Sequence, residues 1–227
     1  MNANEILNSP LEIIEVQHNT DDWLNARLCG IGGSDASCIF GMNPWKTVGQ
    51  LWKEKTNKRQ AKDKSDIEAV EYGIKAETPL VNLFALDFPE FEVLSPKDRV
   101  YKRAFMLASL DGELVHKQTG RKGVLEIKTS AINSKATKLK WDNGIPDYYY
   151  IQVLHYLAVT DYSFAILKAQ LKDTDNDGMP YITTKHYLID REKEKVREDI
   201  FLLVEKEEKF WDSIVNKKHP PLIIPNL

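Results

Sequence analysis

The spacing of the apolar residues changes along this chain from helical to extended and back, and this order restricts the fold to a mixed α/β class. From Asp66 to about Asp87 the apolar residues recur at helical spacing and predict a long helix. Extended runs follow at Phe91–Leu94, Val100–Leu110 and Val124–Thr129, separated by turn residues, and they predict an antiparallel meander. A sheet is therefore expected in the middle of the chain.

The second half of the chain continues the alternation. A helix is expected from about Asp147 to Val159, then two strands at Phe164–Leu171 and Tyr181–Leu188, and finally an amphipathic helix between Arg191 and Asn216. There is neither an internal repeat nor a linker to a second domain. We therefore predict one α/β domain over residues 1–227, with a central mixed sheet flanked by helices.

Three short helices are expected before the long one. Thr20 precedes two acidic residues and is a suitable cap for the first, Ser34 is the expected cap of the second, and Thr47 is the expected cap of the third, which runs through Lys55. The stretch from Asn57 to Asp66 is highly charged and lacks periodicity, so it is predicted to be a mobile loop.

Composition excludes several classes of protein. The net charge of −3 argues against a non-specific nucleic-acid coat protein, because such proteins neutralise phosphates with surplus Lys and Arg. No apolar run approaches the ~20 residues of a membrane helix, and the N-terminus does not resemble a secretory signal, so we expect a cytoplasmic protein. Cys29 and Cys38 lie nine positions apart and are expected to be reduced packing residues.

The sharpest local motif is the run from Val124 to Lys128. Side chains alternate along a strand, so Glu126 and Lys128 should project from one face. Asp111 ends an earlier extended run, and a meander could place it beside Glu126. Mg²⁺ prefers oxygen ligands, often one or two carboxylates with water and phosphate. A lysine beside the metal could orient the attacking water, stabilise developing charge or act as a base.

Neither motif is specific by itself. A Glu-x-Lys strand is common as an exposed cross-strand salt bridge, and Asp111-Gly112 is typical of a turn. Their order favours the functional interpretation, because a predicted helix with Glu77 precedes them and a predicted helix with Gln152 follows.

Five motifs in order resemble the lambda-exonuclease-like (YqaJ-type) viral recombinase nucleases, which have the PD-(D/E)XK nuclease fold. They are Trp23-x-x-x-Arg27-Leu28 with Ile31-Gly32-Gly33-Ser34-Asp35-Ala36, then Tyr72-Gly73-x-x-x-Glu77, Ala108-Ser109-Leu110-Asp111-Gly112, Leu125-Glu126-Ile127-Lys128 and Tyr149-x-x-Gln152-Val153. The resemblance covers most of the chain. Leu110 and Thr129-Ser130 depart from the family pattern, which usually has Pro and Cys-Pro there, but no charged group is lost.

This resemblance implies roles for individual residues. It implies a catalytic set of Glu77, Asp111, Glu126, Lys128 and Gln152, and a metal held by Asp111, Glu126 and Ile127. The expected cofactor is Mg²⁺, with Mn²⁺ able to replace it. Arg27, Ser34 and Ser109 are expected to bind a 5′-phosphate, and the planar donors of an arginine suit such a group.

The implied activity is a 5′→3′ exonuclease that digests one strand of double-stranded DNA from its end and leaves a 3′ single strand for phage-type recombination. The implied assembly is a homo-trimer, and the implied partner is a single-strand annealing protein in a bacterial host. The alternatives are a related endonuclease, an exonuclease of other polarity, or a catalytically silent DNA-end-binding module. The chain has no four-cysteine cluster, which argues against the iron–sulfur relatives.

Two further groups of residues have alternative interpretations. Trp45, Trp52 and Tyr148–Tyr150 could stack on bases, although aromatic residues at helical spacing more often belong to the core. Three lysines before Trp141 could follow a phosphate backbone or form a solvated helix face; they are Lys135, Lys138 and Lys140.

Overall fold

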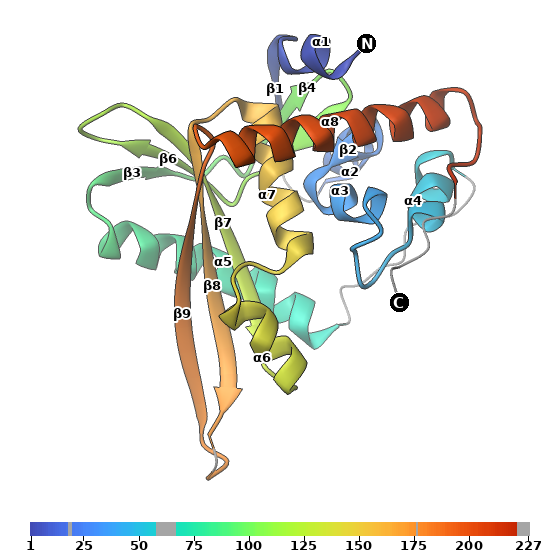
Figure 1. The fold of residues 1–227 in the computed structure, drawn as a ribbon. Coiled ribbons are helices and arrows are strands. Elements are labelled where there is room, and N and C mark those ends of the chain that lie inside the picture. Colours follow the sequence, from blue (N-terminus) through green and yellow to red (C-terminus); the bar gives the residue numbers. More distant parts are fainter. Residues whose placement is uncertain (18–19, 58–66, 176, 222–227) are drawn as a thin grey trace.

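A five-stranded mixed sheet forms the centre of the fold in the computed structural model, which describes residues 1–17, 20–57, 67–175 and 177–221 (Figure 1). Its strand order is β3-β6-β7-β8-β9. Only β7 and β8 are parallel. The strands are β3 (Phe91–Leu94), β6 (Gly112–His116), β7 (Lys122–Ala131), β8 (Phe164–Thr174) and β9 (Pro180–Asp190).

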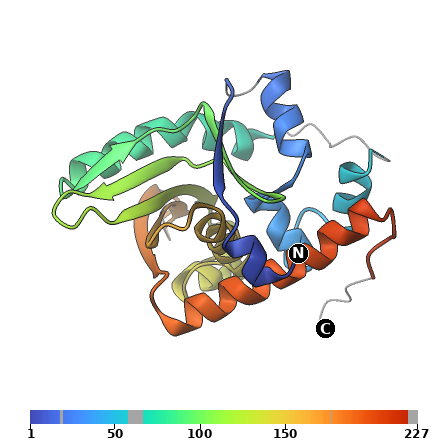
Figure 2. The same cartoon turned by 90° about the horizontal axis from the view of Figure 1, so that it is seen from above.

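A second sheet of four short strands lies close to the N-terminus (Figure 2). Its order is β1-β4-β5-β2, with β2 parallel to β5 and the other pairs antiparallel. The strands are β1 (Leu11–Glu15), β2 (Ile31–Gly32), β4 (Arg99–Arg103) and β5 (Met106–Ala108). The central mixed sheet is thus confirmed, and this smaller sheet is an addition to the prediction.

Helices lie on both faces of the larger sheet. The long helix α5 packs on the face that carries Leu125 and Ile127, and α7 packs on the other face and also against the smaller sheet. Every residue of α7 from Ile151 to Thr160 is buried. The helices are α1 (Ala3–Leu7), α2 (Asp21–Leu28), α3 (Gly33–Ile39), α4 (Val48–Lys55), α5 (Glu68–Asp87), α6 (Lys135–Asp142), α7 (Asp147–Thr160) and α8 (Glu194–Val215).

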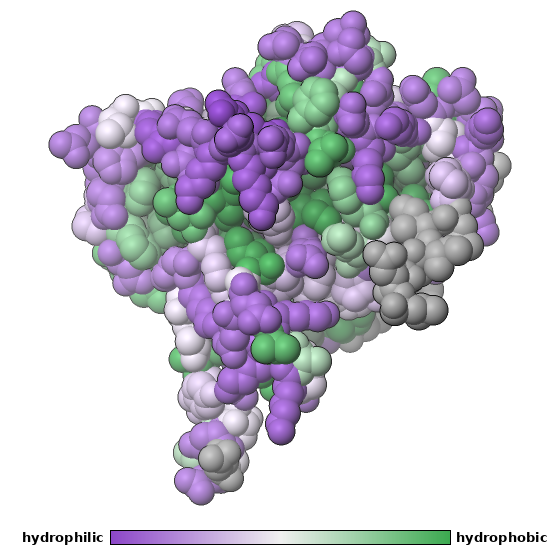
Figure 3. All heavy atoms as spheres, in the orientation of Figure 1, coloured by the Kyte–Doolittle hydropathy of each residue, from purple (hydrophilic) through white to green (hydrophobic). Residues whose placement is uncertain are grey.

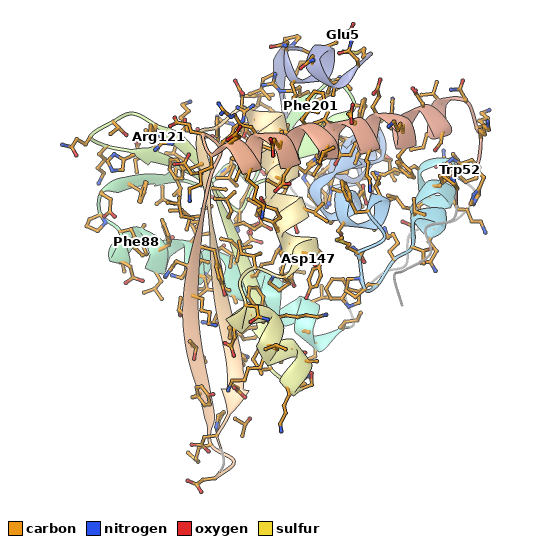
Figure 4. The ribbon with its side chains drawn as sticks, in the orientation of Figure 1. Glu5, Trp52, Phe88, Arg121, Asp147 and Phe201 are labelled. Atoms are coloured by element: carbon orange, nitrogen blue, oxygen red, sulfur yellow. The ribbon has the colours of Figure 1, made fainter. Side chains whose placement is uncertain are left out.

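The C-terminal helix α8 closes the side of the molecule above α7. Its outer face is hydrophilic, and apolar side chains gather beneath it (Figure 3). Its apolar residues Ile200, Leu203 and Val204 belong to the same core as α7. Near its end, the carbonyl of Ser213 accepts a hydrogen bond from the ring of Trp52 on α4, at 3.1 Å (Figure 4).

Most predicted helices are confirmed. Thr20 and Thr47 cap α2 and α4, and the side chain of each accepts a hydrogen bond from a backbone N–H. The predicted loop from Asn57 to Asp66 lies outside the described residues, apart from Asn57. In the described chain, no helix is long and apolar enough to cross a membrane.

Ser34 is not the cap of α3. The helix begins at Gly33 with Gly32 as its cap, and the carboxylate of Asp35 accepts a hydrogen bond from the Gly32 N–H at 3.1 Å. The Asp35 side chain reaches back to the cap position, which leaves the Ser34 hydroxyl exposed in the first turn.

The predicted strand Val100–Leu110 was wrong as a single element. It is a hairpin of β4 and β5 in the smaller sheet, and the turn contains Ala104 with a φ of 52°. Both strands are largely buried, and no Gly, Pro or Asn marks the turn between them. The neighbour of β7 in the meander is instead β6.

Candidate active site

The candidate active site lies where β6 begins, and beyond this point β7 pairs with β8 and no longer with β6. The register of β6 and β7 starts at Gly112 and Leu125, so β7 extends beyond β6 from Glu126 onward. Asp111 immediately precedes β6, and its Oδ2 atom accepts a hydrogen bond from the backbone N–H of Ile127 at 2.8 Å. Asp111 therefore lies beside Glu126 as expected, although it precedes β6 and does not end a strand over Val100–Leu110.

Glu126 and Lys128 of β7 face α7. Leu125 and Ile127 pack with α5, whereas Lys128 Nζ donates a hydrogen bond to Glu126 Oε1 at 2.5 Å. The amide of Gln152 donates to the same Oε1 atom at 2.8 Å. Glu126 is 1% exposed, and its Oε2 atom is buried without a hydrogen-bond partner in the described structure. Two hydrogen bonds thus hold the Glu126 carboxylate through Oε1, whereas Oε2 accepts none in the described structure.

Electrostatics at this edge favour binding of a cation. Burial, and then the charge of Glu126, raise the pKa of Asp111 well above its ordinary value. Burial also raises the pKa of Glu126, although Lys128 opposes the shift. Burial alone would lower the pKa of Lys128, but Glu126 and Asp111 outweigh it and hold that pKa above its ordinary value. In the absence of a metal ion, the two carboxylates thus favour the ammonium form of Lys128.

Glu77 comes to the site from α5. Its carboxylate adds repulsion to both Asp111 and Glu126, and it pairs with Lys97 at 3.3 Å. A cavity of about 230 Å³ connects these elements. The cavity is lined by Val70, Gly73, Ile74, Glu77, Asp111, Ile127, Lys128 and Thr129. A Cβ atom at Gly73 would lie 3.4 Å from Thr129 Oγ1, so glycine lets α5 approach β7 closely here.

The donor set fits a hard divalent cation with few protein ligands. Among the described residues, no group of three or more His, Cys, Asp or Glu side chains converges as a ready metal site. Asp111 and Glu126 remain as a carboxylate pair, which suits Mg²⁺ because that ion keeps several waters. The N–H and C=O of one strand residue point to the same side. The Ile127 carbonyl therefore faces Asp111, like the Ile127 N–H.

A second cavity, of about 240 Å³, lies on the other side of Lys128. Its walls come from α3, the turn after it, β7 and α7. They are formed by Ser34, Ser37, Asn43, Trp45, Lys46, Lys128, Tyr148, Tyr149 and Gln152. A Cβ atom at Gly33 would lie 2.4 Å from the ring of Tyr156 and 3.1 Å from Gln152. Glycine at position 33 thus brings the exposed Ser34 close to α7.

Arg27 and Ser109 do not line either of these cavities in the described structure. The guanidinium of Arg27 lies over the ring of Trp23, 4.5 Å from its centroid, and Ser109 is half-buried in the segment between β5 and Asp111. The cavities thus bring together Glu77, Asp111, Lys128, Gln152 and Ser34, with Glu126 bonded to Lys128 and Gln152.

Two tyrosines of α7 belong to the site: Tyr149, which is part of the Tyr149-x-x-Gln152 motif, and Tyr156, which was not predicted there. The hydroxyl of Tyr156 accepts a hydrogen bond from Gln152 at 2.8 Å, and the ring of Tyr149 lies 5.0 Å from Lys128 Nζ. Tyr156 follows Gln152 by four residues, a spacing that places both on one helix face and could have indicated the contact. The core interpretation is confirmed for Trp52 but wrong for Trp45, which is 62% exposed.

Solved structures with this fold include two exonucleases. The alkaline exonuclease of Laribacter hongkongensis has a TM-score of 0.55 at 17% identity, covering 88% of this chain and 96% of that one. Its complex with dAMP has a TM-score of 0.52. A phage-related exonuclease of Haemophilus somnus 129PT has a TM-score of 0.54 at 16% identity, covering 85% and 98%. At these identities the likeness shows a shared fold.

Sequence comparisons identify the family. The chain is 40% identical over 149 residues to the uncharacterized protein YqaJ of Bacillus subtilis strain 168. That match covers 61% of this chain and 42% of YqaJ, so it spans less than half of the relative. Residues 22–163, more than half of the chain, match the model of the YqaJ-like viral recombinase domain. The chain therefore belongs to the family of YqaJ-like viral recombinase domains.

Proposed function

We propose that this chain is a Mg²⁺-dependent deoxyribonuclease that digests one strand of duplex DNA from its 5′ end and leaves a 3′ single strand for recombination. The unpaired Oε2 atom of Glu126 beside Asp111 carries the proposal. A buried carboxylate oxygen without a donor is costly, and a bound cation would satisfy it. The bound cation would also counteract the burial and the neighbouring carboxylates that raise the pKa values of Asp111 and Glu126.

Each residue of the site has a chemical task in this reaction. Asp111, Glu126 and the Ile127 carbonyl would hold the metal. Bound Mg²⁺ polarises a phosphate and makes a coordinated water more acidic. The ammonium of Lys128 supplies positive charge where negative charge grows on the phosphate. Gln152 keeps Glu126 in one orientation through the 2.8 Å hydrogen bond to Oε1.

The preference for a 5′ end is supported by the cavity beside Lys128. Ser34 is exposed there, so its hydroxyl can contact a terminal phosphate while Lys128 faces the cleavage site. Arg27 and Ser109 are the other proposed phosphate ligands. The fold is shared with an alkaline exonuclease that forms a complex with dAMP, a mononucleotide that carries phosphate and base.

The proposed assembly is a homo-trimer acting in the cytoplasm of a bacterial host, with a single-strand annealing protein that receives the 3′ strand. These features come with the family resemblance. Light scattering on the purified protein tests the assembly, since a monomer mass at micromolar concentration would contradict it. Co-purification with an annealing protein encoded nearby tests the partner.

The activity is tested on duplexes whose two strands carry different labels. Substrates with a 5′-phosphate, a 5′-hydroxyl or no ends are incubated with Mg²⁺, Mn²⁺ or EDTA. We expect shortening from 5′ ends with either metal, faster on 5′-phosphate, and none in EDTA or on closed circles. Digestion from 3′ ends would contradict the polarity, cleavage of circles would indicate an endonuclease, and binding without cleavage would indicate a silent module.

Variants assign the roles of two basic residues. Lys128→Ala should keep binding of duplex ends in EDTA and lose cleavage, whereas Arg27→Ala should lessen the preference for 5′-phosphate. Lys75→Ala is the matched control, because the Lys75 side chain is 74% exposed and forms an ion pair with Glu71 one turn away on the same helix. Cleavage by Lys128→Ala at the wild-type rate would remove this lysine from the mechanism.

A further inference from the structure

A row of three aromatic side chains leads from solvent to the catalytic lysine. The rings of Trp45 and Tyr148 meet edge to face, with centroids 5.3 Å apart and an interplanar angle of 80°. The ring of Tyr148 lies 4.4 Å from that of Tyr149, and Tyr149 lies 5.0 Å from Lys128 Nζ. We call Trp45, Tyr148 and Tyr149 the aromatic row. It begins at an exposed ring and ends beside Glu126.

The main chain at Trp45 is firmly held although its ring is exposed. The Asn43 side-chain oxygen accepts hydrogen bonds from the backbone N–H groups of Trp45 and Lys46, both at 2.9 Å. The Asn43 amide in turn donates to Ser37 Oγ at 2.9 Å, and Lys46 Nζ donates to Glu54 at 2.6 Å. The turn thus presents a large apolar side chain to solvent in a fixed place, which is a feature of binding surfaces.

The geometry of the pair leaves a ring face available. When two rings meet edge to face, one of them directs only its edge at the other, so both of its own faces stay free of that contact. Trp45 is 62% exposed, and Tyr148 is half-buried. A planar group can therefore stack on this pair. Every nucleobase has such a face, and stacking on aromatic side chains does not depend on sequence.

The cavity at the aromatic row has both polar and aromatic walls. Ser34, Lys128 and Gln152 are among its polar residues, and Trp45, Tyr148 and Tyr149 supply its rings. Its volume of about 240 Å³ is below the ~300–1,000 Å³ usual for ligand sites, so it suits one nucleotide rather than a length of duplex. A nucleotide likewise combines a charged phosphate with an aromatic base.

We infer that Trp45 and Tyr148 bind the base of the 5′-terminal nucleotide after it has separated from its partner strand. The inference rests on the proposed function, which places the phosphates of that nucleotide at Lys128 and Ser34. Stacking would compensate for the lost base pair and keep the terminal nucleotide in line with the carboxylates. Trp45 and Tyr148 are thus positioning residues for a single unpaired nucleotide.

Binding of 5′-phosphorylated single-stranded oligonucleotides in EDTA tests this inference without cleavage. One oligonucleotide has a normal 5′-terminal base and the other an abasic 5′-terminal sugar. Wild type should bind the first more tightly, by about 5- to 150-fold for one stacked base. Trp45→Ala should lose this difference while its affinity for the abasic oligonucleotide stays unchanged, and Trp45→Phe should keep most of it.

Leu86→Ala is the control, because Leu86 is another exposed apolar side chain, 78% exposed, and lies on α5. Equal binding of the two oligonucleotides by wild type would overturn the inference, as would a Trp45→Ala variant that still distinguishes them. Base-dependent binding by a protein that never cuts DNA would instead defeat the proposed function alone. Thermal unfolding of each variant verifies that the exposed positions leave the fold intact.

Discussion

Replacing His155 by Leu should destabilise this protein far more than replacing both members of its buried ion pair. His155 and Glu207 are each 0% exposed, and His155 Nδ1 lies 2.8 Å from Glu207 Oε1. His155 Nε2 lies 2.9 Å from the Leu107 carbonyl, which can only accept a hydrogen bond. Nε2 therefore carries a proton, and an ionised Glu207 requires one on Nδ1 as well. Glu207 raises the pKa of His155, which favours an imidazolium beside a carboxylate, while burial raises the pKa of Glu207 itself.

The magnitude follows from the separation and the burial. At 2.8 Å and an effective dielectric constant of ~20, the attraction is about 6 kcal/mol. Desolvation costs several kcal/mol per ion, so the net contribution of the pair is small. Removing only His155 leaves Glu207 buried without its counter-charge, and Glu207 Oε2 already has no partner. We expect His155→Leu to lower the free energy of unfolding by ~3–5 kcal/mol.

The double variant His155→Leu, Glu207→Leu should recover most of that loss, because no buried charge remains. It still lacks the donor to the Leu107 carbonyl, so we expect it within ~1–3 kcal/mol of wild type. Urea unfolding at pH 7, followed by tryptophan fluorescence and circular dichroism, measures all three proteins. A single variant within ~1 kcal/mol of wild type, or a double variant no more stable than the single one, would refute the reasoning.

The pair also predicts a dependence of stability on pH. Burial alone would lower the pKa of His155, but Glu207 and the Leu107 carbonyl outweigh it and hold that pKa above its ordinary value. This stabilisation is complete below the unfolded pKa of ~6.5 and is lost as the pH rises through the folded pKa. The wild-type free energy of unfolding should therefore fall as pH rises above neutrality. The free energy of unfolding of the double variant should not show this fall with pH. An equal fall in both proteins would refute the assignment of the pH dependence to His155.

Three further variants test the packing and charge of the active site. Gly33→Ala places a Cβ atom 2.4 Å from the Tyr156 ring, so it should lower the free energy of unfolding by ~1–3 kcal/mol in urea titrations and reduce cleavage. Tyr156→Phe removes the acceptor of a Gln152 hydrogen bond and should cost ~1 kcal/mol on the same scale; a neutral result would show that water replaces it. Asp111→Asn removes a buried charge repelled by Glu126, so in EDTA it should raise the free energy of unfolding by ~0.5–2 kcal/mol while calorimetry shows loss of Mg²⁺ binding. A destabilised Asp111→Asn would indicate that its hydrogen bond to Ile127 outweighs the repulsion.

Local patterns in the sequence were sufficient for much of the fold. Helical periodicity predicted α5 and α7, and alternation at Glu126 and Lys128 predicted which face of β7 is charged, because these signals depend only on residues a few positions apart. The hairpin of β4 and β5 was missed because its turn at Ala104 has no turn-forming residue. The smaller sheet was missed because β1 pairs with residues about ninety positions away.

The sequence predicted those site residues that belong to a short motif. It did not predict contacts between single side chains that are far apart in the chain. The pairing of Asp111 with Glu126 follows from the order of neighbouring strands. The exposure of Trp45 depends instead on how the turn after α3 is held against Glu54 and Ser37, and composition gives no signal of it. Lys97, which pairs with Glu77, likewise comes from a loop with no motif.

The ion pair of His155 and Glu207 restrains the helix that carries Gln152. Gln152 and His155 lie one turn apart on α7; Gln152 contacts Glu126 on β7, and His155 contacts Glu207 on α8. Hydrophobic contacts alone allow a buried helix to shift along its axis at small cost, whereas buried charges must meet at hydrogen-bonding distance. The pair therefore holds α7 in position relative to α8, and His155 Nε2 also links α7 to the Leu107 carbonyl on β5. We therefore expect the contact between residues 155 and 207, which no motif around Gln152 contains, to affect how Gln152 meets Glu126.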